Sequence, residues 1–137
     1  MLRLLIFLPL ALSACSSSIP AEDLLVDYLE ISDSGKTEQY SEVLSGSALS
    51  SALEANQIMS DLGLSQVGET RFYRFESTEV NQYQFCLDVS ETSLRDLAGQ
   101  DRTPIQRPTQ VPMLMKVQNF PNGPRISELD LRRFAKC

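Results

Sequence analysis

Histidine and tryptophan are both absent from this sequence of 137 residues. Without histidine, the chain has no Ser-His-Asp triad, no Asp–His catalytic pair and no histidine-ligated metal centre. It also has no Cys-x-x-Cys pair, no glycine-rich phosphate loop and no calcium-binding loop. The side chains left for acid–base chemistry are carboxylates and the four tyrosines. We predict no metal and no cofactor, and we predict that the protein is not an enzyme.

Basic residues are scarce, with 12 Lys and Arg against 18 Asp and Glu and a formal net charge of −6. A surface of this charge repels phosphate backbones, so we expect no nucleic-acid partner. Arginines and aromatics alternate at residues 71–75, a pattern that also occurs in nucleic-acid stacking platforms. The acidic balance favours an ordinary strand there, and it argues against a peripheral hold on anionic lipid.

Long apolar runs are missing except near the N-terminus, where Leu4–Leu12 contains nine residues. A membrane-spanning helix needs roughly 20 apolar residues, so this run is too short to remain as a span. It follows Arg3 and precedes small residues, which is the layout of a secretory signal. Leu12-Ser13-Ala14-Cys15 resembles the bacterial lipobox, whose cysteine thiol receives a diacylglyceryl group before cleavage. We predict a signal peptide at 1–14 and lipid attachment at Cys15; the alternative is a core segment with a buried thiol.

Cleavage at this site places the mature chain on the extracytoplasmic face of a bacterial membrane, anchored by acyl chains such as palmitate. Residues 15–20 then form a short lipidated tether, and residues 21–137 are long enough for a single domain with its own core. Ser16 directly after the lipidated cysteine resembles an outer-membrane sorting signal in bacteria with two membranes.

Two cysteines remain in the domain once Cys15 carries lipid. An even pair in an oxidising compartment predicts a disulfide between Cys86 and Cys137. Closing a loop of this length stabilises the fold by about 4 kcal/mol in the chain-entropy model. The alternative is two unpaired thiols, and a catalytic thiol lacks a histidine to activate it.

Residues 20–62 carry the patterns of three helices. The first begins at Pro20, with acidic residues in its first turn, and stops at Ser34-Gly35. Its apolar stripe consists of Leu24, Leu25, Tyr28, Leu29 and Ile31. A short second helix is predicted from about Thr37 to Gly46, and Ser47 opens a third that ends at Gly63. The inward residues predicted for the third are Leu49, Ala52, Leu53, Ile58, Met59 and Leu62.

Alternating patterns replace the helical ones from Val67 onward. Two strands have a clear apolar face, Tyr83, Phe85, Leu87 and Val89 on one and Val111, Met113, Met115 and Val117 on the other. Shorter strands are predicted at 71–76 and 91–97, and the turn at 121–124 leads into a last strand with Leu129 and Leu131. Residues 99–108 read as a polar loop with two prolines. Helices followed by antiparallel strands predict an α+β fold with one sheet face covered by the helices.

A family resemblance accompanies this order of elements. The segment Ala21 to Leu53, with its serine-glycine turn at Ser34-Gly35 and the run Leu44-Ser45-Gly46-Ser47-Ala48-Leu49, looks like the opening helices of nuclear transport factor 2-like (SnoaL-like) domains. The later strands and the terminal cysteine are similar to small actinobacterial-type lipoproteins of that fold. The resemblance implies a cone, in which a curved antiparallel sheet wraps around a helix and leaves a pocket. The fold hosts many activities, so the resemblance does not assign one.

Carboxylates on the polar strand faces are the remaining catalytic candidates. Asp88, Glu128 and Asp130 lie opposite the apolar faces, and a carboxylate near a tyrosine performs general acid–base work when burial raises its pKa. The simpler interpretation is solvated acids paired loosely with Lys116 or Arg132.

Five residues are candidates for lining the pocket of the cone: Tyr28, Tyr83, Phe85, Met113 and Met115. The methionines also fit an ordinary core at this spacing. We therefore predict a non-enzymatic binding or accessory module of the envelope, with a small apolar ligand or an envelope protein as partner. The alternatives are a small isomerase or hydrolase that uses a buried carboxylate, and a pure assembly partner that includes a homodimer.

Overall fold

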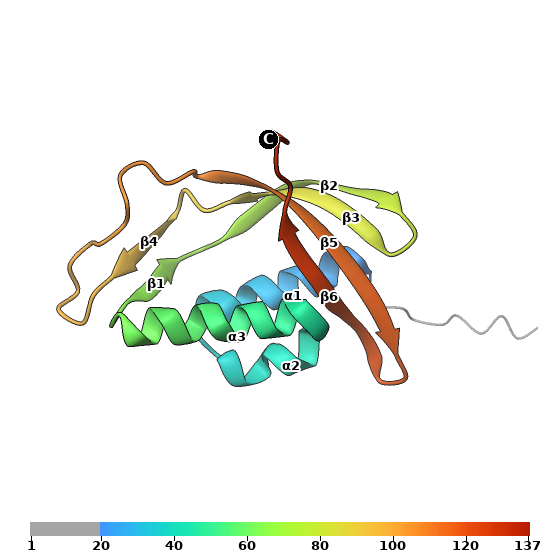
Figure 1. Ribbon diagram of the computed structural model, residues 1–137, viewed down its shortest axis with the longest axis horizontal. Helices are drawn as coiled ribbons and strands as arrows, with labels where there is room; N and C mark the ends of the chain where they lie inside the picture. The colour runs from blue at the N-terminus through green and yellow to red at the C-terminus, as the bar shows by residue number, and fades with distance from the viewer. Residues whose placement is uncertain (1–19) are drawn as a thin grey trace, which may run out of the picture.

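The computed structural model describes residues 20–137, and its element order is helices first and strands afterwards (Figure 1). The predicted signal peptide, the lipid attachment at Cys15 and most of the tether lie outside the described residues. The helical elements are α1 (Ala21–Ser34), the 3-10 turn η1 (Thr37–Gln39), α2 (Tyr40–Val43) and α3 (Gly46–Asp61). The strands are β1 (Ser65–Gly68), β2 (Arg71–Glu79), β3 (Gln82–Asp88), β4 (Thr92–Arg95), β5 (Gln110–Phe120) and β6 (Gly123–Leu131).

The strands form antiparallel sheets that curve over the helices. Four strands pair in the order β2-β3-β5-β6, and β1 pairs with β4 in a separate two-stranded ribbon. Figure 1 shows α1, α2 and α3 together beneath one face of this arrangement, with the C-terminal tail rising from the opposite face. The predicted α+β fold, with N-terminal helices packed on a curved antiparallel sheet, is confirmed.

Helix α1 follows its sequence signals closely. Pro20 lies at the N-cap, acidic residues occupy the first turn, and Gly35 ends the helix in the left-handed conformation at φ 69°. The last carbonyls of α1 accept hydrogen bonds from the backbone N–H groups of Gly35 and Lys36, which satisfies groups that a helix end would otherwise leave free. The apolar stripe faces the sheet, where Leu24, Leu25 and Leu29 are buried.

The second and third helices depart from the prediction. The segment predicted as one helix from about Thr37 to Gly46 divides into η1 and α2, and Leu44 is already extended at ψ 153°. Its extended backbone pairs in parallel with Ile126 on β6, so a sheet contact ends the helix early.

Helix α3 begins one residue before the predicted Ser47, and its inward face is smaller than predicted. Ala48 is buried and two neighbours, Leu49 and Ala52, pack partly against the core. Three residues predicted to face inward are instead solvent-exposed, namely Leu53 (47%), Ile58 (51%) and Leu62 (65%). The prediction was wrong because α3 contacts the sheet mainly through β6, while its C-terminal half continues toward β1, beyond the four-stranded sheet (Figure 1).

The core lies between α1, the α2–α3 segment and the inner sheet face. Its fully buried side chains are Leu25, Leu44, Met115 and Ile126. A register shift between Lys116 and Val117 on β5 places Ile126 of β6 opposite Val117. On β6 it is therefore Ile126 that is fully buried, while the predicted strand residue Leu131 is 57% exposed.

Candidate functional site

A cavity of about 200 Å³ lies between α1 and the inner face of the sheet. It is mostly apolar, with polar groups on the side of β1. Its lining consists of Leu25, Tyr28, Leu29, Ser32, Gln66, Thr70, Phe85, Leu87, Val89, Met113 and Leu129. The helix stripe and the alternating strand faces supply the apolar part, because each element turns its hydrophobic side to the same layer.

A second, wider cleft of about 410 Å³ lies beside the cavity, between α1, α3 and the β1–β4 ribbon. Its residues include Tyr40, Asn56, Met59, Ser60 and Leu94. Tyr28, Ser32 and Gln66 line both spaces, so the two adjoin along that side of α1. Apolar and polar side chains line both spaces.

Tyr28 stands at this junction, and its phenol is the most perturbed titratable group there. Burial raises the pKa of Tyr28 to about 12, and the nearby Tyr40 and Asp33 add to the shift while a hydrogen bond with Ser32 opposes it. The rings of Tyr28 and Tyr40 have centroids 6.1 Å apart. The phenol stays neutral at physiological pH, so it serves as a hydrogen-bond donor or acceptor and not as a charge.

Three of the five residues predicted to line a pocket meet in the cavity: Tyr28, Phe85 and Met113. The other two lie elsewhere. Tyr83 stacks on Phe75 at a centroid distance of 5.2 Å, and Met115 is fully buried in the core.

Sequence reasoning did not find the polar residues of the site. Ser32 lies on the polar side of α1, and Gln66 lies on β1, a strand that the alternation pattern missed because it contains one apolar residue, Val67. Gln66 is held in place by hydrogen bonds from its amide to Asp33 (3.2 Å) and Thr70 (3.3 Å). Asp33 also accepts hydrogen bonds from the backbone N–H and hydroxyl of Thr70, which ties the end of α1 to the start of β2.

The candidate carboxylates lie on the outer sheet face, away from the cavity. Hydrogen bonding to the Ser90 side chain and then to its backbone N–H, which donates to the Asp88 carboxylate at 2.9 Å, lowers the pKa of Asp88. Glu128 pairs with Lys116 at 2.8 Å on the surface, and Asp130 is exposed. None of the three lines the cavity or the cleft, so the enclosed acid that the enzyme alternative requires is not among them.

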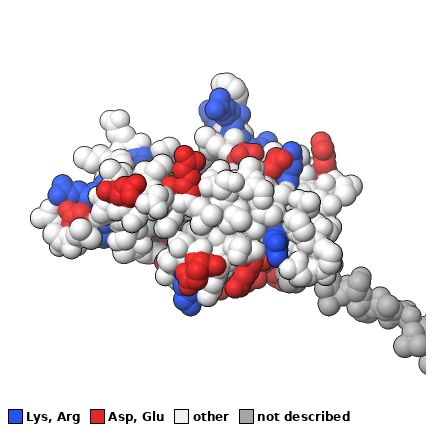
Figure 2. Space-filling model, turned by 60° about the horizontal axis from the view of Figure 1, so that its bottom comes forward, with Lys and Arg blue, Asp and Glu red and all other residues white. Residues whose placement is uncertain are grey.

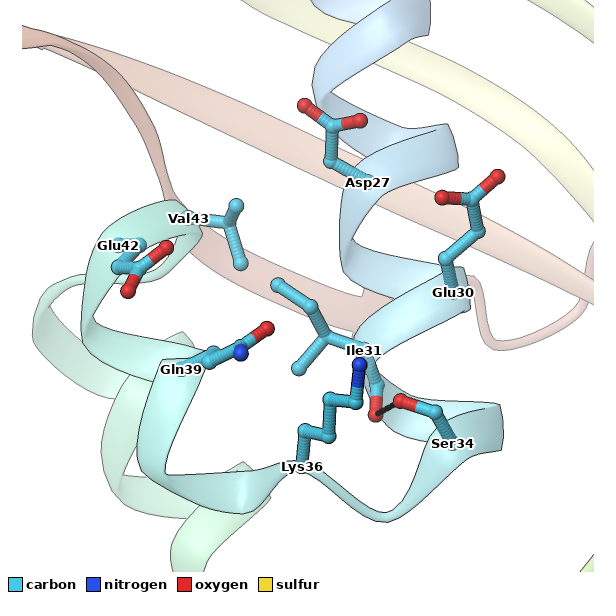
Figure 3. A pocket seen from close by; sticks show the side chains of 8 residues that line it. All are labelled: Asp27, Glu30, Ile31, Ser34, Lys36, Gln39, Glu42 and Val43. Atoms are coloured by element: carbon cyan, nitrogen blue, oxygen red, sulfur yellow. Dashed lines mark hydrogen bonds between the residues drawn. The ribbon is translucent and has the colours of Figure 1, made fainter.

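A separate acidic groove of about 390 Å³ lies between α1 and α2 (Figure 3). Asp27 and Glu30 border it from α1, Glu42 borders it from α2, and the Lys36 side chain extends into it. Its apolar floor is Ile31 and Val43. Within residues 20–137 no group of His, Cys, Asp or Glu is placed to hold a metal ion, so these acids form a charged rim and not a metal centre.

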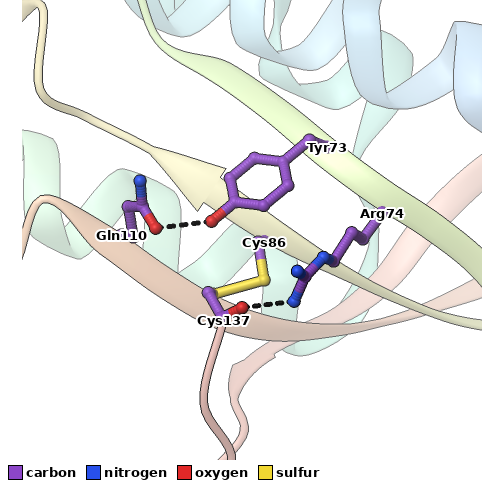
Figure 4. Close-up of a disulfide and its surroundings, with 5 residues drawn as sticks. All are labelled: Tyr73, Arg74, Cys86, Gln110 and Cys137. Carbon is purple, nitrogen blue, oxygen red and sulfur yellow. Dashed lines mark hydrogen bonds between the residues drawn. A yellow bond between two sulfur atoms is a disulfide. The ribbon is translucent and has the colours of Figure 1, made fainter.

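Cys86 and Cys137 are joined in a disulfide on the outer sheet face, with Cα atoms 5.7 Å apart (Figure 4). Arg74 donates a hydrogen bond to the carbonyl of Cys137, and the Tyr73 hydroxyl donates to the Gln110 side chain (2.6 Å). The disulfide fixes Cys137 to β3, an inner strand of the four-stranded sheet. In the described part of the chain, no helix has both the length and the apolar character needed to cross a membrane.

Comparison with known proteins identifies a similar fold but does not indicate a function. No family model matches the sequence, and no curated protein matches it. Among solved structures, the chain is similar to the intermembrane space region of the chloroplast protein ARC6, with a TM-score of 0.62 and 18% identity over 81% of this chain and 92% of that one. At this identity the similarity shows the fold alone.

Proposed function

We propose that this chain is a lipid-anchored protein on the extracytoplasmic face of a bacterial membrane, and that its domain is a non-enzymatic binding module. The observation that carries the binding role is the cavity under α1, which adjoins the cleft beside α3 at Tyr28. Concave sites with an apolar lining and a few polar groups are typical of small-molecule binding.

The lining indicates the kind of ligand. The inner cavity is bordered by Leu25, Phe85 and Met113, which favour an apolar group, and the shared side offers the Tyr28 phenol and the Gln66 amide. No Lys or Arg lines either space. We infer a small, largely apolar ligand with an uncharged hydrogen-bonding group at one end.

Mass spectrometry of protein purified from its native membrane tests the location. We expect a diacylglyceryl-modified Cys15 at the start of the mature chain and a co-purifying small molecule. Protein recovered with Met1 intact and no acyl group contradicts the proposed location, whatever the outcome for the cavity.

Binding of Nile red, an uncharged apolar dye, tests the cavity. The variant Met113→Trp places a larger ring in the cavity, so we expect it to weaken dye binding at least tenfold. Leu114→Trp is the matched control, because the next residue of β5 pairs with Gln84 and Asp130 and faces the outer side. Dye binding that is equal in both variants contradicts the cavity as the site.

An assembly partner is the second candidate, and the exposed apolar residues of α3 favour it. Ile58 and Leu62, four positions apart at the C-terminal end of α3, leave one side of the helix end that the fold itself does not cover. If this surface binds a protein, Ile58→Glu abolishes a crosslink that forms on intact cells, while Gln57→Glu, its exposed neighbour, retains it.

The resemblance to nuclear transport factor 2-like domains stays a prediction, and the order of the elements is compatible with it.

A further inference from the structure

The last six residues, 132–137, form a short loop that is held at both ends on the outer sheet face. The backbone N–H of Arg132 donates to the carbonyl of Pro112 on β5 at 2.8 Å. At the other end, Cys137 is bonded to Cys86 on β3, and its carbonyl accepts a hydrogen bond from Arg74. The tail stands out from the sheet on the side opposite the helices (Figure 1).

Phe134 is at the apex of this loop and points into solvent. Its side chain is fully exposed, at 104% of the reference area. Its φ of 66° lies in the left-handed region, which a bulky residue rarely adopts. The turn is closed by a hydrogen bond from the Ala135 N–H to the Arg132 carbonyl (3.3 Å). The fold thus fixes an aromatic ring outward, where it gains nothing from the protein core.

Basic residues flank Phe134 in the sequence. Arg132, Arg133 and Lys136 have no carboxylate within 4.0 Å among residues 20–137, whereas four other basic residues of the domain form ion pairs. A hollow of about 300 Å³ beside the loop is lined by Arg74, Arg132 and Lys136, with Glu76 as its one acid. Figure 2 shows basic side chains on the part of the molecule that protrudes at its upper edge, with further basic and acidic side chains spread over the rest of this face. The C-terminal tail therefore carries three basic side chains close together, and Arg74 adds a fourth beside them.

We propose that this tip, formed by Arg132, Arg133, Phe134 and Lys136, is a second membrane contact that docks on anionic phospholipid. Aromatic rings favour the headgroup region of a bilayer, and each nearby Lys or Arg adds attraction to an anionic surface. The inference rests on the proposed lipid anchor. Residues 15–19 extend to roughly 17 Å at most, which keeps the domain close to the bilayer.

An anionic bilayer fits the tip better than an acidic protein does. The ring is a single protruding contact without a surrounding apolar patch on the tail, and protein interfaces bury such anchors in a wider patch. A lone aromatic flanked by cations inserts into an interface without needing a shaped partner. The contact would turn the tip, and not the acidic groove between α1 and α2, toward the membrane.

The absence of tryptophan from the sequence permits a direct test. In the lipidated, disulfide-bonded protein, Phe134→Trp introduces the only indole. With the protein anchored in vesicles of phosphatidylcholine and phosphatidylglycerol, we expect its emission to shift to the blue and to be quenched by brominated lipid. In vesicles of phosphatidylcholine alone, and at high salt, the shift and the quenching should largely disappear.

Two controls isolate the tip. Ile105→Trp reports on an equally exposed residue (103%) in the loop before β5, and it should stay in water in every vesicle. Replacing Arg132, Arg133 and Lys136 by Gln in the Phe134→Trp background should lower the ratio of docked to undocked tip on the order of 100-fold, since each basic residue contributes about fivefold.

Three results overturn the proposal: an emission unchanged by phosphatidylglycerol, an equal shift for Ile105→Trp, or a shift that survives the Gln substitutions. The first of these points to an acidic protein as the partner of the tip. The mass of the N-terminal peptide is read on the same sample, so a missing acyl group is recognised as failure of the anchor. In that case the unanchored Phe134→Trp protein is added to the same vesicles, and its emission still shows whether the tip binds phosphatidylglycerol.

Discussion

At the scale of single residues, the side chains that matter are those whose surroundings are unusual for their type. Tyr28 is a phenol placed where an apolar cavity meets an open cleft, and its neutral form is strongly favoured there. Met115 is a flexible side chain with no exposed surface, held opposite Tyr83 and Leu129 on the adjoining strands. Tyr28 can form a hydrogen bond with a ligand, whereas Met115 contributes only packing to the core.

Ionisation of Tyr28 should make the fold less stable in alkali. The folded pKa of about 12 lies above the ordinary value of 10.0, so between these values the folded state holds a proton that the unfolded state has lost. The contribution of Tyr28 is therefore complete below pH 10 and decreases as the pH rises toward 12, by at most about 2–3 kcal/mol. Urea unfolding below and above pH 10 measures it, and Tyr28→Phe should reduce the pH dependence. An identical pH dependence in the variant would refute this assignment.

Met115→Ala should lower the free energy of unfolding by about 2–5 kcal/mol, because it removes a fully buried side chain and leaves a cavity. Leu131→Ala, on the neighbouring strand and 57% exposed, is the matched control and should change it by about 0.5 kcal/mol or less. Urea midpoints of the two variants give the comparison, and similar losses would contradict the placement of the core.

At the scale of elements, the β1–β4 ribbon extends the hairpin of β2 and β3 and forms one wall of the cleft. It depends on a close backbone approach at Gly68, which has φ 100° and pairs with Thr92. A Cβ atom there would lie 2.0 Å from the carbonyl oxygen of Glu91. Arg107 reinforces the same place by donating to the Thr92 hydroxyl (3.1 Å) and to the Val89 carbonyl (2.9 Å).

Gly68→Ala should therefore disrupt the ribbon more than the same change at Gly99, which also has a positive φ but has open space around its Cβ position. The unfavourable φ costs about 1–2 kcal/mol in both variants, and the clash at Gly68 adds about 1–3 kcal/mol. Hydrogen exchange of β1 and β4 amides, measured together with the urea midpoint, distinguishes the two. Equal destabilisation would mean that the strands can separate at no cost.

The elements that sequence reasoning predicted well are those with local signals. The helix α1 carries an N-terminal proline, early acids and a terminal glycine, and β3 and β5 alternate over many residues, so each element reveals itself without its neighbours. β1 is four residues long and forms only by pairing with β4 about thirty positions later. The exposed side of α3 was missed for a related reason, since helical spacing shows which residues share a face but not how far the sheet extends beneath it. The cavity was predicted in part, through Tyr28, Phe85 and Met113, while its polar residues depend on β1.

At the scale of the whole molecule, charge is distributed unevenly, and the net value of −6 conceals this. Acids border the groove between α1 and α2, and unpaired cations gather on the C-terminal tail. Arg132, Arg133 and Lys136 are neighbours in the sequence and were overlooked because the acidic total was taken to describe the whole surface, whereas Arg74 joins them only through the fold, by its hydrogen bond to Cys137. The disulfide therefore supports both the stability of the domain and the position of the tip.

Breaking the Cys86–Cys137 bond should lower the free energy of unfolding by about 4 kcal/mol, because its partners are 51 positions apart and the open chain gains loop entropy. The variant Cys137→Ser and the reduced parent protein should unfold at the same urea concentration, well below that of the oxidised parent. An unchanged midpoint after complete reduction would contradict a stabilising bond.

The two outer strands of the four-stranded sheet are both poor templates for a further strand. The free side of β6 is occupied by Leu44 and by the Ser45 N–H, which donates to the Ile126 carbonyl at 2.8 Å. β2 is interrupted by an irregularity between Tyr73 and Glu76 and bears four charged residues. Neither edge of the four-stranded sheet therefore offers a neighbouring copy of the domain a regular ladder of free amides, which protects the protein against aggregation through these edges.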